Sequence, residues 1–520
     1  MSGRRIAPMA VLFALWAGAV CAADITPEKI EAYTARANEA FKVTGLAVTV
    51  VDSDSIIFQE TYGVRDVRTG APVDENTIFP FASIGKAFTT ASLAMLVDEG
   101  KLGWDDPVRK YIPEFEMSDP YITAEFSVRD LVTHRSGLPL GAGDLLVIPD
   151  AKPEVSDILA AIKHIPPATS FRSEYAYDNL MYMIAGEVLS RIDRRPWHKS
   201  IEARLFKPLG MRSCEALPSK AAASKRTVTQ HLRTPGSWDA KPIDPRYIVG
   251  DNTSPAGGIS CPIEDLSKWA QFWLNDGKTP SGERLITEEQ VKELWTGVTP
   301  QNVNPMLSQL GNTHFSLYGL GWTLRDFHGK LLVGHSGGLL GASAYFGLLP
   351  EEDVAVFVTS NVSTPGASAL ALQILNEAAA PGSDSDWIGV LSEYYARVQA
   401  TAQKDAGLGE GAGDVAIEPV RPLKDYVGVY VDPWYGPVSI EIRDDALFID
   451  MSRSEVLDAP LIPVEPDKFV ARWPDRSLNA DAYVIFSTED GDIVGMEMEA
   501  VSETTDFSFD FHDLKFVRRR

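Results

Sequence analysis

The chain has 520 residues, of which 45% are hydrophobic and 23% are charged. These proportions are typical of a soluble globular protein of two or three domains, and they exclude a disordered, fibrous or multi-span membrane chain. The 72 acidic and 48 basic residues give a formal net charge of −24. A surface this anionic repels phosphate backbones, so we expect no nucleic-acid partner.

The first 23 residues differ in composition from the rest. Arg4 and Arg5 precede an apolar run over residues 6–20, and Val20-Cys21-Ala22 supplies small residues in an A-x-A-like pattern. This predicts a signal peptide over residues 1–23, cleaved near Ala22 or Ala23. We expect a periplasmic or secreted protein with no stable membrane insertion after signal removal, because no later stretch is long and apolar enough to span a bilayer.

Outside that leader, only Cys214 and Cys261 remain. Two cysteines do not make the disulfide framework of a small secreted domain. Because a chain of this size can stabilise its fold without a crosslink, we favour two unpaired thiols over a disulfide between them.

The first predicted elements are a β-hairpin and a helix. Two β-branched runs, 46–51 and 56–58, flank a polar turn. Over residues 86–99, apolar residues recur at helical spacing, and Gly100 follows where a helix C-terminus favours glycine. A second helix is predicted from Leu180 to about Ile192.

Strand-like sequence returns near residue 331, in the runs 330–333, 342–348 and 354–358. Strands at both ends of residues 24–378, with helices between them, predict an α+β first domain in which one mixed sheet joins distant parts of the chain.

The rest of the chain predicts a linker and a second domain. Residues 379–420 are rich in Ala, Gly, Ser and Asp and contain one amphipathic stretch around 387–398, which indicates a linker with a helix. Residues 421–520 show short alternating runs such as 438–442, which predict a small all-β domain, either a barrel or a sandwich.

Ser83-Ile84-Gly85-Lys86 stands at the start of the first predicted helix. Residues three apart lie on the same helix face, so the ammonium of Lys86 can reach the hydroxyl of Ser83. Unpaired N–H groups at a helix N-terminus also favour an alkoxide or oxyanion there. Taken alone, this short pattern also fits a solvated helix start.

Two further short motifs follow in the chain. Tyr177-Asp178-Asn179 leads into the second predicted helix, and an ammonium beside Tyr177 would stabilise phenolate and lower the tyrosine pKa. His335-Ser336-Gly337-Gly338 lies between two strand runs. The order Ser-x-x-Lys, Tyr-x-Asn, His-x-Gly is a stronger signal than any of the three motifs alone.

With these motifs the chain resembles the penicillin-recognising serine hydrolases, in the branch of class C β-lactamases, D-alanyl-D-alanine carboxypeptidases, D-aminopeptidases and related esterases. The resemblance covers about residues 30–375, and the tail from Arg421 resembles the β-barrel that often follows this catalytic domain. The supporting stretches are Glu99-Gly100-Lys101-Leu102 with Asp105-Asp106-Pro107, the run 131–139, Pro255-Ala256-Gly257-Gly258-Ile259 and Tyr318-Gly319-Leu320-Gly321-Trp322.

The resemblance implies a role for each motif residue. Ser83 would be the acylated nucleophile, Lys86 and Tyr177 would share the general-base work, and Asn179 would orient Lys86 and the substrate amide. His335 would stand on a strand of the site where many relatives have lysine. The oxyanion hole would be the backbone N–H groups of Ser83 and Gly338, with Ser336 and Gly337 binding substrate.

The resemblance also implies an antiparallel sheet covered by helices, an all-helical cluster, and an active site in the groove between them. The substrates would be small amides, peptides or esters, and no cofactor or metal is expected. A histidine at position 335 carries little charge at pH 7, which disfavours an efficient β-lactamase. A β-lactamase remains an alternative, as does a receptor that is acylated without turnover.

A rival pattern occupies the same region. Residues 334–338 satisfy the Gly-x-Ser-x-Gly pattern of a nucleophile elbow, and Asp353 and His512 could complete a triad. We disfavour this interpretation because the next segment, 339–348, is rich in glycine and β-formers rather than helix-like.

Overall fold

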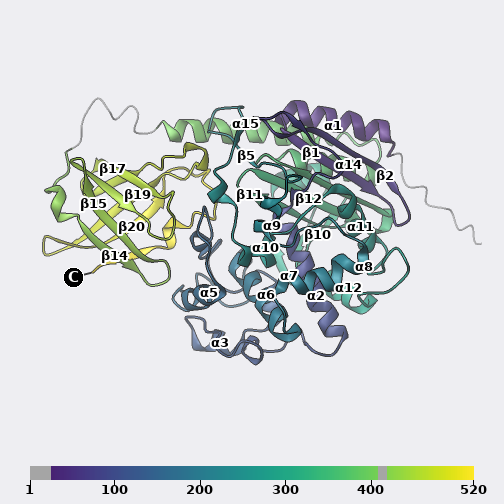
Figure 1. Ribbon diagram of the computed structural model, residues 1–520, viewed down its shortest axis with the longest axis horizontal. Helices are drawn as coiled ribbons and strands as arrows, with labels where there is room; N and C mark the ends of the chain where they lie inside the picture. The colour runs from purple at the N-terminus through teal and green to yellow at the C-terminus, as the bar shows by residue number, and fades with distance from the viewer. Residues whose placement is uncertain (1–24, 408–417, 520) are drawn as a thin grey trace, which may run out of the picture.

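The computed structural model describes residues 25–407 and 418–519. The predicted signal peptide lies outside these residues. Figure 1 shows the larger first domain on the right and a β-barrel on the left, with helix α15 (Trp387–Ala406) running between them. No helix in the described part of the chain is both long and apolar enough to cross a membrane.

An antiparallel sheet of nine strands organises the first domain. Strand β1 pairs with β13, so the two distant ends of the domain meet in the middle of the sheet, as predicted. In spatial order the strands are β3 (Ala71–Pro72), β2 (Ile56–Asp66), β1 (Gly45–Val51), β13 (Val354–Ser360), β12 (Ala342–Leu349), β11 (Lys330–Leu339), β10 (Thr323–Phe327), β9 (Ser316–Tyr318) and β8 (Thr299–Gln301).

The central strands are buried on both faces. Successive side chains of a strand point to opposite faces: Leu46, Val48 and Val50 of β1 pack in one hydrophobic cluster and Ala47 and Val51 in another. The first cluster is completed by helices α1 (Pro27–Phe41), α14 (Gly366–Ala379) and α15, which lie together along one side of the sheet in Figure 1.

The opposite face carries the helical cluster. Its longer helices are α2 (Lys86–Asp98), α6 (Asn179–Asp193) and α11 (Ile263–Leu274), and the first two confirm the helices predicted from periodicity. The shorter helices are α3 (Pro120–Glu125), α4 (Val128–Leu131), α5 (Val155–Ile162), α7 (Trp197–Ile201), α8 (Lys207–Leu209), α9 (Pro218–Ala223), α10 (Ser254–Gly257) and α12 (Glu288–Leu294). Helix α13 (Pro305–Gly311) packs instead against the first cluster, through Met306, Leu307 and Leu310.

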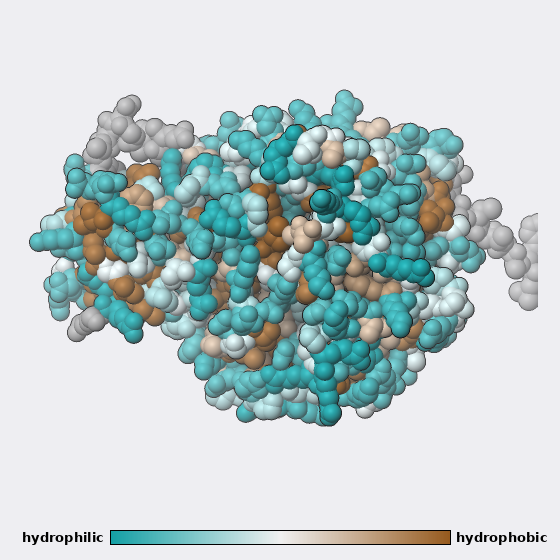
Figure 2. Space-filling view, in the orientation of Figure 1, coloured by the Kyte–Doolittle hydropathy of each residue, from teal (hydrophilic) through white to brown (hydrophobic). Residues whose placement is uncertain are grey.

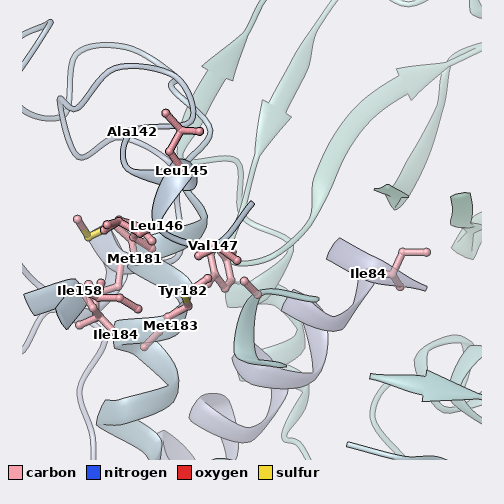
Figure 3. Packing of buried hydrophobic residues seen from close by; sticks show 14 of the residues in the cluster. Ile84, Ala142, Leu145, Leu146, Val147, Ile158, Met181, Tyr182, Met183 and Ile184 are labelled. Atoms are coloured by element: carbon pink, nitrogen blue, oxygen red, sulfur yellow. The ribbon is translucent and has the colours of Figure 1, made fainter. Parts of the chain in front are cut away.

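Helix α6 anchors the loop that faces it. In Figure 3, Leu145, Leu146 and Val147 lie near Met181, Met183 and Ile184 of α6, and all six residues belong to one buried hydrophobic cluster. This packing fixes the backbone around Asp144, which lies between Gly143 and Leu145 on the same loop.

The second domain is a closed barrel of eight antiparallel strands, which decides between the predicted barrel and sandwich. Alternate residues fill its interior, such as Val438 and Ile440 or Val484 and Phe486. The strands are β14 (Gly428–Asp432), β15 (Gly436–Arg443), β16 (Ala446–Asp450), β17 (Asp458–Glu465), β18 (Lys468–Ala471), β19 (Ala482–Glu489), β20 (Asp492–Ala500) and β21 (Lys515–Arg518).

The prediction of two unpaired thiols is wrong, because Cys214 and Cys261 form a disulfide. Cys261 lies on β7 (Ser260–Cys261), and Glu215 bridges to Ser260 across an antiparallel contact. This pairing brings the two cysteines onto adjacent backbones, which their separation in sequence did not reveal. Strand β7 also pairs with β4 (Phe79–Pro80), the segment that leads to Ser83.

Candidate active site

Ser83 lies on a single 3₁₀ turn, Ala82–Gly85, directly before α2. The residue before it, Ala82, has a φ of 52°, a left-handed conformation that residues with a Cβ rarely adopt. This turn redirects the chain from β4 into α2. Lys86 is the first residue of α2, so the predicted Ser83–Lys86 spacing across a helix start is present.

Two glycines let neighbouring backbones press against this turn. A Cβ on Gly337 of β11 would lie 2.2 Å from the carbonyl oxygen of Phe81, and a Cβ on Gly257 of α10 would lie 2.9 Å from the carbonyl carbon of Ala82. Neither position has room for a side chain. The turn that carries Ser83 is therefore held between β11 and α10 by close backbone contact.

Lys86 is fully buried behind Ser83. Its Nζ lies 3.1 Å from Ser83 Oγ, 2.8 Å from Asn179 Oδ1 and 2.8 Å from the carbonyl oxygen of Ala256. Burial disfavours the charged form and lowers the pKa of Lys86 to about 7, although the carboxylates of Asp144 and Asp178 act in the opposite direction. A substantial fraction of neutral amine is therefore present at neutral pH.

Asn179 is the first residue of α6, and Asp178 caps that helix through the backbone N–H of Met181. The Nδ2 of Asn179 donates to Asp144 Oδ2 at 2.9 Å, which leaves its Oδ1 facing Lys86. The Ser508 hydroxyl donates to the same Asp144 oxygen at 2.9 Å. Burial raises the pKa of Asp144 to about 7. Asp144 and Ser508 thus orient Asn179, and sequence reasoning missed both because neither belongs to a spaced motif.

Tyr177 lies over the same ammonium, with Lys86 Nζ 4.7 Å from the centre of its ring. His134 packs against Tyr177, at 4.2 Å between ring centres. Burial raises the pKa of Tyr177 well above its usual value, against a hydrogen bond with Ser83 that lowers it. The predicted lowering of the Tyr177 pKa is therefore wrong in direction, because loss of hydration is the largest effect on it.

His335 stands on β11, but both ring nitrogens have partners within the protein. Nδ1 lies 2.6 Å from the Ser336 carbonyl oxygen and therefore donates to it, and Nε2 accepts from the Tyr318 hydroxyl at 3.0 Å. Burial lowers the pKa of His335 to about 3, and Lys86 acts in the same direction. His335 is a neutral part of the wall rather than a cation.

These residues meet at a pocket of about 940 Å³. Ser83, Tyr177, Asn179, His335, Ser336 and Gly338 line it, whereas Lys86 and Gly337 lie behind its surface. A Cβ on Gly338 would meet no atom within 4 Å, so the strand is open toward the pocket at the position expected to supply an oxyanion donor. The loop 138–153 also contributes, through Asp144, Val147 and Ile148.

The barrel forms part of the same pocket. The loop between β20 and β21 contributes Phe507, Ser508 and Phe509 to the lining. Phe507 meets Tyr177 edge to face at 5.8 Å between ring centres. The buried Asp510 carboxylate accepts from the backbone N–H groups of Gly143 at 2.6 Å and Leu145 at 3.1 Å. No sequence pattern indicated that the second domain reaches the site.

The nucleophile-elbow interpretation does not fit the structure. Residues 334–338 lie within β11, which continues through a turn into β12 instead of a helix. Asp353 bonds to the backbone N–H and hydroxyl of Ser53, so it orients no histidine beside Ser336.

Comparison with known proteins agrees with this geometry. "Unguisins hydrolase ungD" of Aspergillus violaceofuscus is 25% identical over 422 residues, covering 77% of this chain and 74% of that protein. "Penicillin-binding protein 4" of Amycolatopsis lactamdurans is 27% identical over 347 residues, covering 65% of this chain and 86% of that protein.

Solved structures share the fold. The octameric penicillin-binding protein homologue from Pyrococcus abyssi superposes with a TM-score of 0.58 at 19% identity, over 94% of this chain and 99% of the other. The penicillin-binding protein from Bacillus halodurans gives 0.54 at 20% identity, over 66% and 98%.

Family models cover both domains. A domain of unknown function (DUF3471) matches residues 413–518, which include the barrel. The beta-lactamase family model matches residues 30–380, which hold the Ser83, Tyr177 and His335 motifs. The chain belongs to the beta-lactamase family, whose members are serine hydrolases.

Proposed function

We propose that this protein is an exported serine hydrolase that cleaves small amide, peptide or ester substrates through an acyl-enzyme. The observation that carries the proposal is the contact of 3.1 Å between Lys86 Nζ and Ser83 Oγ, at a lysine whose pKa is lowered by burial to about 7. A relative named as a hydrolase is consistent with hydrolysis as the general reaction.

Lys86 is the better base of the two candidates. Asn179 Oδ1 and the Ala256 carbonyl can only accept hydrogen bonds, so they take the two N–H groups of a neutral amine. The remaining lone pair of Lys86 then faces the Ser83 hydroxyl. Tyr177, whose pKa is raised, keeps its proton. Lys86 therefore removes the Ser83 proton as Oγ attacks the substrate carbonyl.

The rest of the cycle follows from the same groups. The backbone N–H groups of Ser83 and Gly338 stabilise the oxyanion of the tetrahedral intermediate. The leaving amine or alcohol takes a proton from the Lys86 ammonium as its bond to the carbonyl carbon breaks, which returns Lys86 to the neutral amine. Water then attacks the acyl-enzyme, and Lys86 accepts a proton from it. As the bond between the carbonyl carbon and Ser83 Oγ breaks, Lys86 returns this proton to Oγ, so that the acid product leaves and Ser83 and the neutral Lys86 are restored.

Two observations support an exported protein. The sequence of residues 1–23 predicts a signal peptide, and the Cys214–Cys261 disulfide is of a kind that persists in oxidising compartments such as the periplasm.

Substitution of the nucleophile tests the proposed function. Ser83→Ala should abolish hydrolysis of short-chain p-nitrophenyl esters, D-amino-acid amides and D-Ala-D-Ala peptides, because only the Oγ atom is lost. Circular dichroism and thermal unfolding of the variant should match the parent. Hydrolysis of a responsive ester at the parental rate by Ser83→Ala would exclude Ser83 as the nucleophile.

Intact-mass measurement separates hydrolase, β-lactamase and acylated receptor. A transient adduct with product release supports turnover, whereas a lasting adduct after a β-lactam, without hydrolysis of any ester or peptide, would favour a receptor. Rapid clearance of a chromogenic cephalosporin would favour a β-lactamase.

A further inference from the structure

Residues 131–139 support the family resemblance, yet the proposed mechanism uses none of them. In this run, His134 packs its ring against Tyr177, at 4.2 Å between ring centres. His134 has a φ of 53°, a left-handed conformation that is uncommon for residues with a Cβ and in which Asn, Asp and His are enriched. Such conformations cost free energy and cluster at functional sites.

His134 binds the backbone on both sides of Tyr177. Its carbonyl oxygen accepts from the N–H of Ala176 at 3.0 Å, and its ring nitrogen Nδ1 accepts from the N–H of Asp178 at 3.1 Å. The carbonyl oxygen of Tyr177 accepts in turn from the N–H of Gly141 at 2.8 Å. Both polar groups of the peptide bond between Tyr177 and Asp178 are therefore held, and one residue binds the chain before and after Tyr177.

The chemistry of the His134 ring suits this role. Because Nδ1 accepts from an N–H group, the ring proton lies on Nε2. Burial lowers the pKa of His134 well below its usual value, and Lys86 acts in the same direction, so the ring is neutral and Nδ1 keeps its lone pair. Nε2 is buried and has no hydrogen-bond partner within the described part of the chain. The polar contact that the ring does make is with the backbone beside Tyr177.

Two rigid elements hold His134 itself in place. Its ring packs against Tyr182 of α6 at 5.3 Å and against Tyr318 of β9 at 4.5 Å, both measured between ring centres. The Tyr182 hydroxyl donates to the carbonyl oxygen of Val132 at 2.7 Å, which ties the chain just before His134 to the same helix. His134 therefore fixes the Tyr177 loop relative to both the helical cluster and the sheet.

We propose that His134 is a positioning residue that holds the Tyr177 hydroxyl against Ser83 and thereby sets the reactivity of the nucleophile. Tyr177 and Ser83 share a hydrogen bond, and a displacement of about 1 Å at a catalytic contact can lower a rate about 10²-fold. His134 does not line the pocket, so it acts on the reaction through its neighbours, of which Tyr177 contacts Ser83. The inference rests on the proposed hydrolase function and adds a residue outside the three short motifs.

Two substitutions of similar size test the hydrogen bond from Asp178. His134→Asn keeps an acceptor, its Oδ1, in the place of Nδ1, and asparagine tolerates the left-handed backbone. His134→Leu has no acceptor. With p-nitrophenyl butyrate, we expect kcat to fall about 10²-fold in His134→Leu and to stay within about fivefold of the parent in His134→Asn. KM should stay within about threefold in both variants, because His134 does not line the pocket.

His328→Leu is the matched control for backbone strain. His328 has a φ of 51°, and its Nε2 lies 2.8 Å from Asn376 Oδ1, but it does not line the pocket. In denaturant unfolding this variant should lose stability as His134→Leu does, while it keeps the parental kcat. An equal loss of kcat in the two leucine variants would overturn the proposal, because strain alone would then account for it.

Tyr177→Phe provides a readout that a general loss of stability would not change. This variant should lower kcat at least about tenfold, because the hydroxyl at Ser83 is lost. Adding His134→Leu to it should change kcat by no more than about twofold, since the group that His134 positions is already absent. If the two losses multiplied in the double variant, His134 would act independently of the Tyr177 hydroxyl, and the proposal would be excluded.

The outcomes separate this inference from the proposed function. If Ser83→Ala is inactive while His134→Leu or Tyr177→Phe keeps the parental kcat, the positioning role is excluded and the hydrolase stands. If Ser83→Ala keeps the parental activity, both are excluded. If His134→Leu fails to fold, His134→Gln takes its place with the same expected losses, because its acceptor lies one bond farther from the backbone than Nδ1.

Discussion

Lys86 is completely buried, and the groups around it only partly stabilise its ammonium form. Burial lowers its pKa from 10.5 to about 7, while Asp144 and Asp178 raise it. Because these two carboxyl groups themselves have pKa values raised by burial to about 7, they give the ammonium only partial support. Lys86 can therefore accept a proton at neutral pH, as the proposed function requires, although a lysine side chain is normally protonated there.

The pH dependence of catalysis follows from this pKa. Below about pH 7, Lys86 is protonated and has no lone pair for the Ser83 proton, so kcat/KM for a neutral ester should fall about tenfold per pH unit. Above about pH 7 it should level off. The measurement is kcat/KM for p-nitrophenyl butyrate between pH 5 and 9, corrected for spontaneous hydrolysis.

Two variants assign the titrating group. Lys86→Arg keeps a cation that stays protonated, so activity should fall by about 10²–10⁴ at every pH. Asp144→Asn removes a charge that raises the lysine pKa, so the decrease of kcat/KM at acidic pH should begin at a lower pH than in the parent. If kcat/KM still decreased below the same pH in both variants, a group other than Lys86 would control the rate.

At the residue scale, the sequence identified the site residues that belong to short motifs and missed those that belong to none. Ser83, Lys86, Tyr177 and Asn179 were recognisable from short spacings. Asp144 and Ser508 lie in loops with no such pattern, and only the fold brings them to the pocket. The direction of the Tyr177 pKa was also beyond the sequence, because it depends on how completely the hydroxyl is desolvated.

At the scale of elements, the end of β11 both packs against the turn that carries Ser83 and borders the pocket. Periodicity predicted the start of this strand but not its continuation through His335–Gly338, because glycines lower strand propensity. The structure explains Gly337, because a Cβ there would meet the Phe81 carbonyl. Gly338 faces open space, so no such contact requires a glycine there.

Adjacent glycines therefore provide a matched pair of substitutions. Gly337→Ala places a Cβ about where the Phe81 carbonyl stands, so β11 must move away from the Ser83 turn. We expect kcat/KM to fall about 10²-fold or more, as for a lost oxyanion donor, and stability to fall by about 1–3 kcal/mol. Steady-state kinetics and denaturant unfolding measure the two effects.

Gly338→Ala is the control, since its Cβ meets nothing within 4 Å and its backbone N–H is retained. Its stability should match the parent, and its kcat/KM should change far less than that of Gly337→Ala. Equal kinetic losses in both variants would mean that the strand contributes through its pocket surface rather than through its packing on the turn.

At the scale of the whole molecule, the barrel contacts the pocket of the first domain directly. Its β20–β21 loop places Phe507 on Tyr177 and bonds Ser508 to Asp144, while Asp510 holds two N–H groups of the loop around Asp144. The surface in the view of Figure 2 is mostly hydrophilic on both domains. Composition could predict a second β domain, but not this contact, because one loop of ordinary sequence makes it.

This contact predicts that a change in the barrel lowers catalysis in the first domain. Asp510→Ala leaves the buried N–H groups of Gly143 and Leu145 without an acceptor, at a cost of about 1–3 kcal/mol each. The loop that carries Asp144 should then shift, and Asn179 and Lys86 with it. We expect kcat/KM for a neutral ester to fall at least about tenfold, measured together with the free energy of unfolding.

A control is needed because any variant that weakens the contact between the two domains could lower activity simply by destabilising the protein. Tyr247→Phe removes another hydrogen bond between the domains, from Tyr247 to Asp475 at 2.8 Å, made by residues that do not line the pocket. It should lower stability by about 0.5–1.5 kcal/mol and leave kcat/KM within about twofold of the parent. If Asp510→Ala lost stability but kept parental kinetics, the barrel would be an attachment rather than a part of the active site, because the Asp144 loop would then hold its position without it.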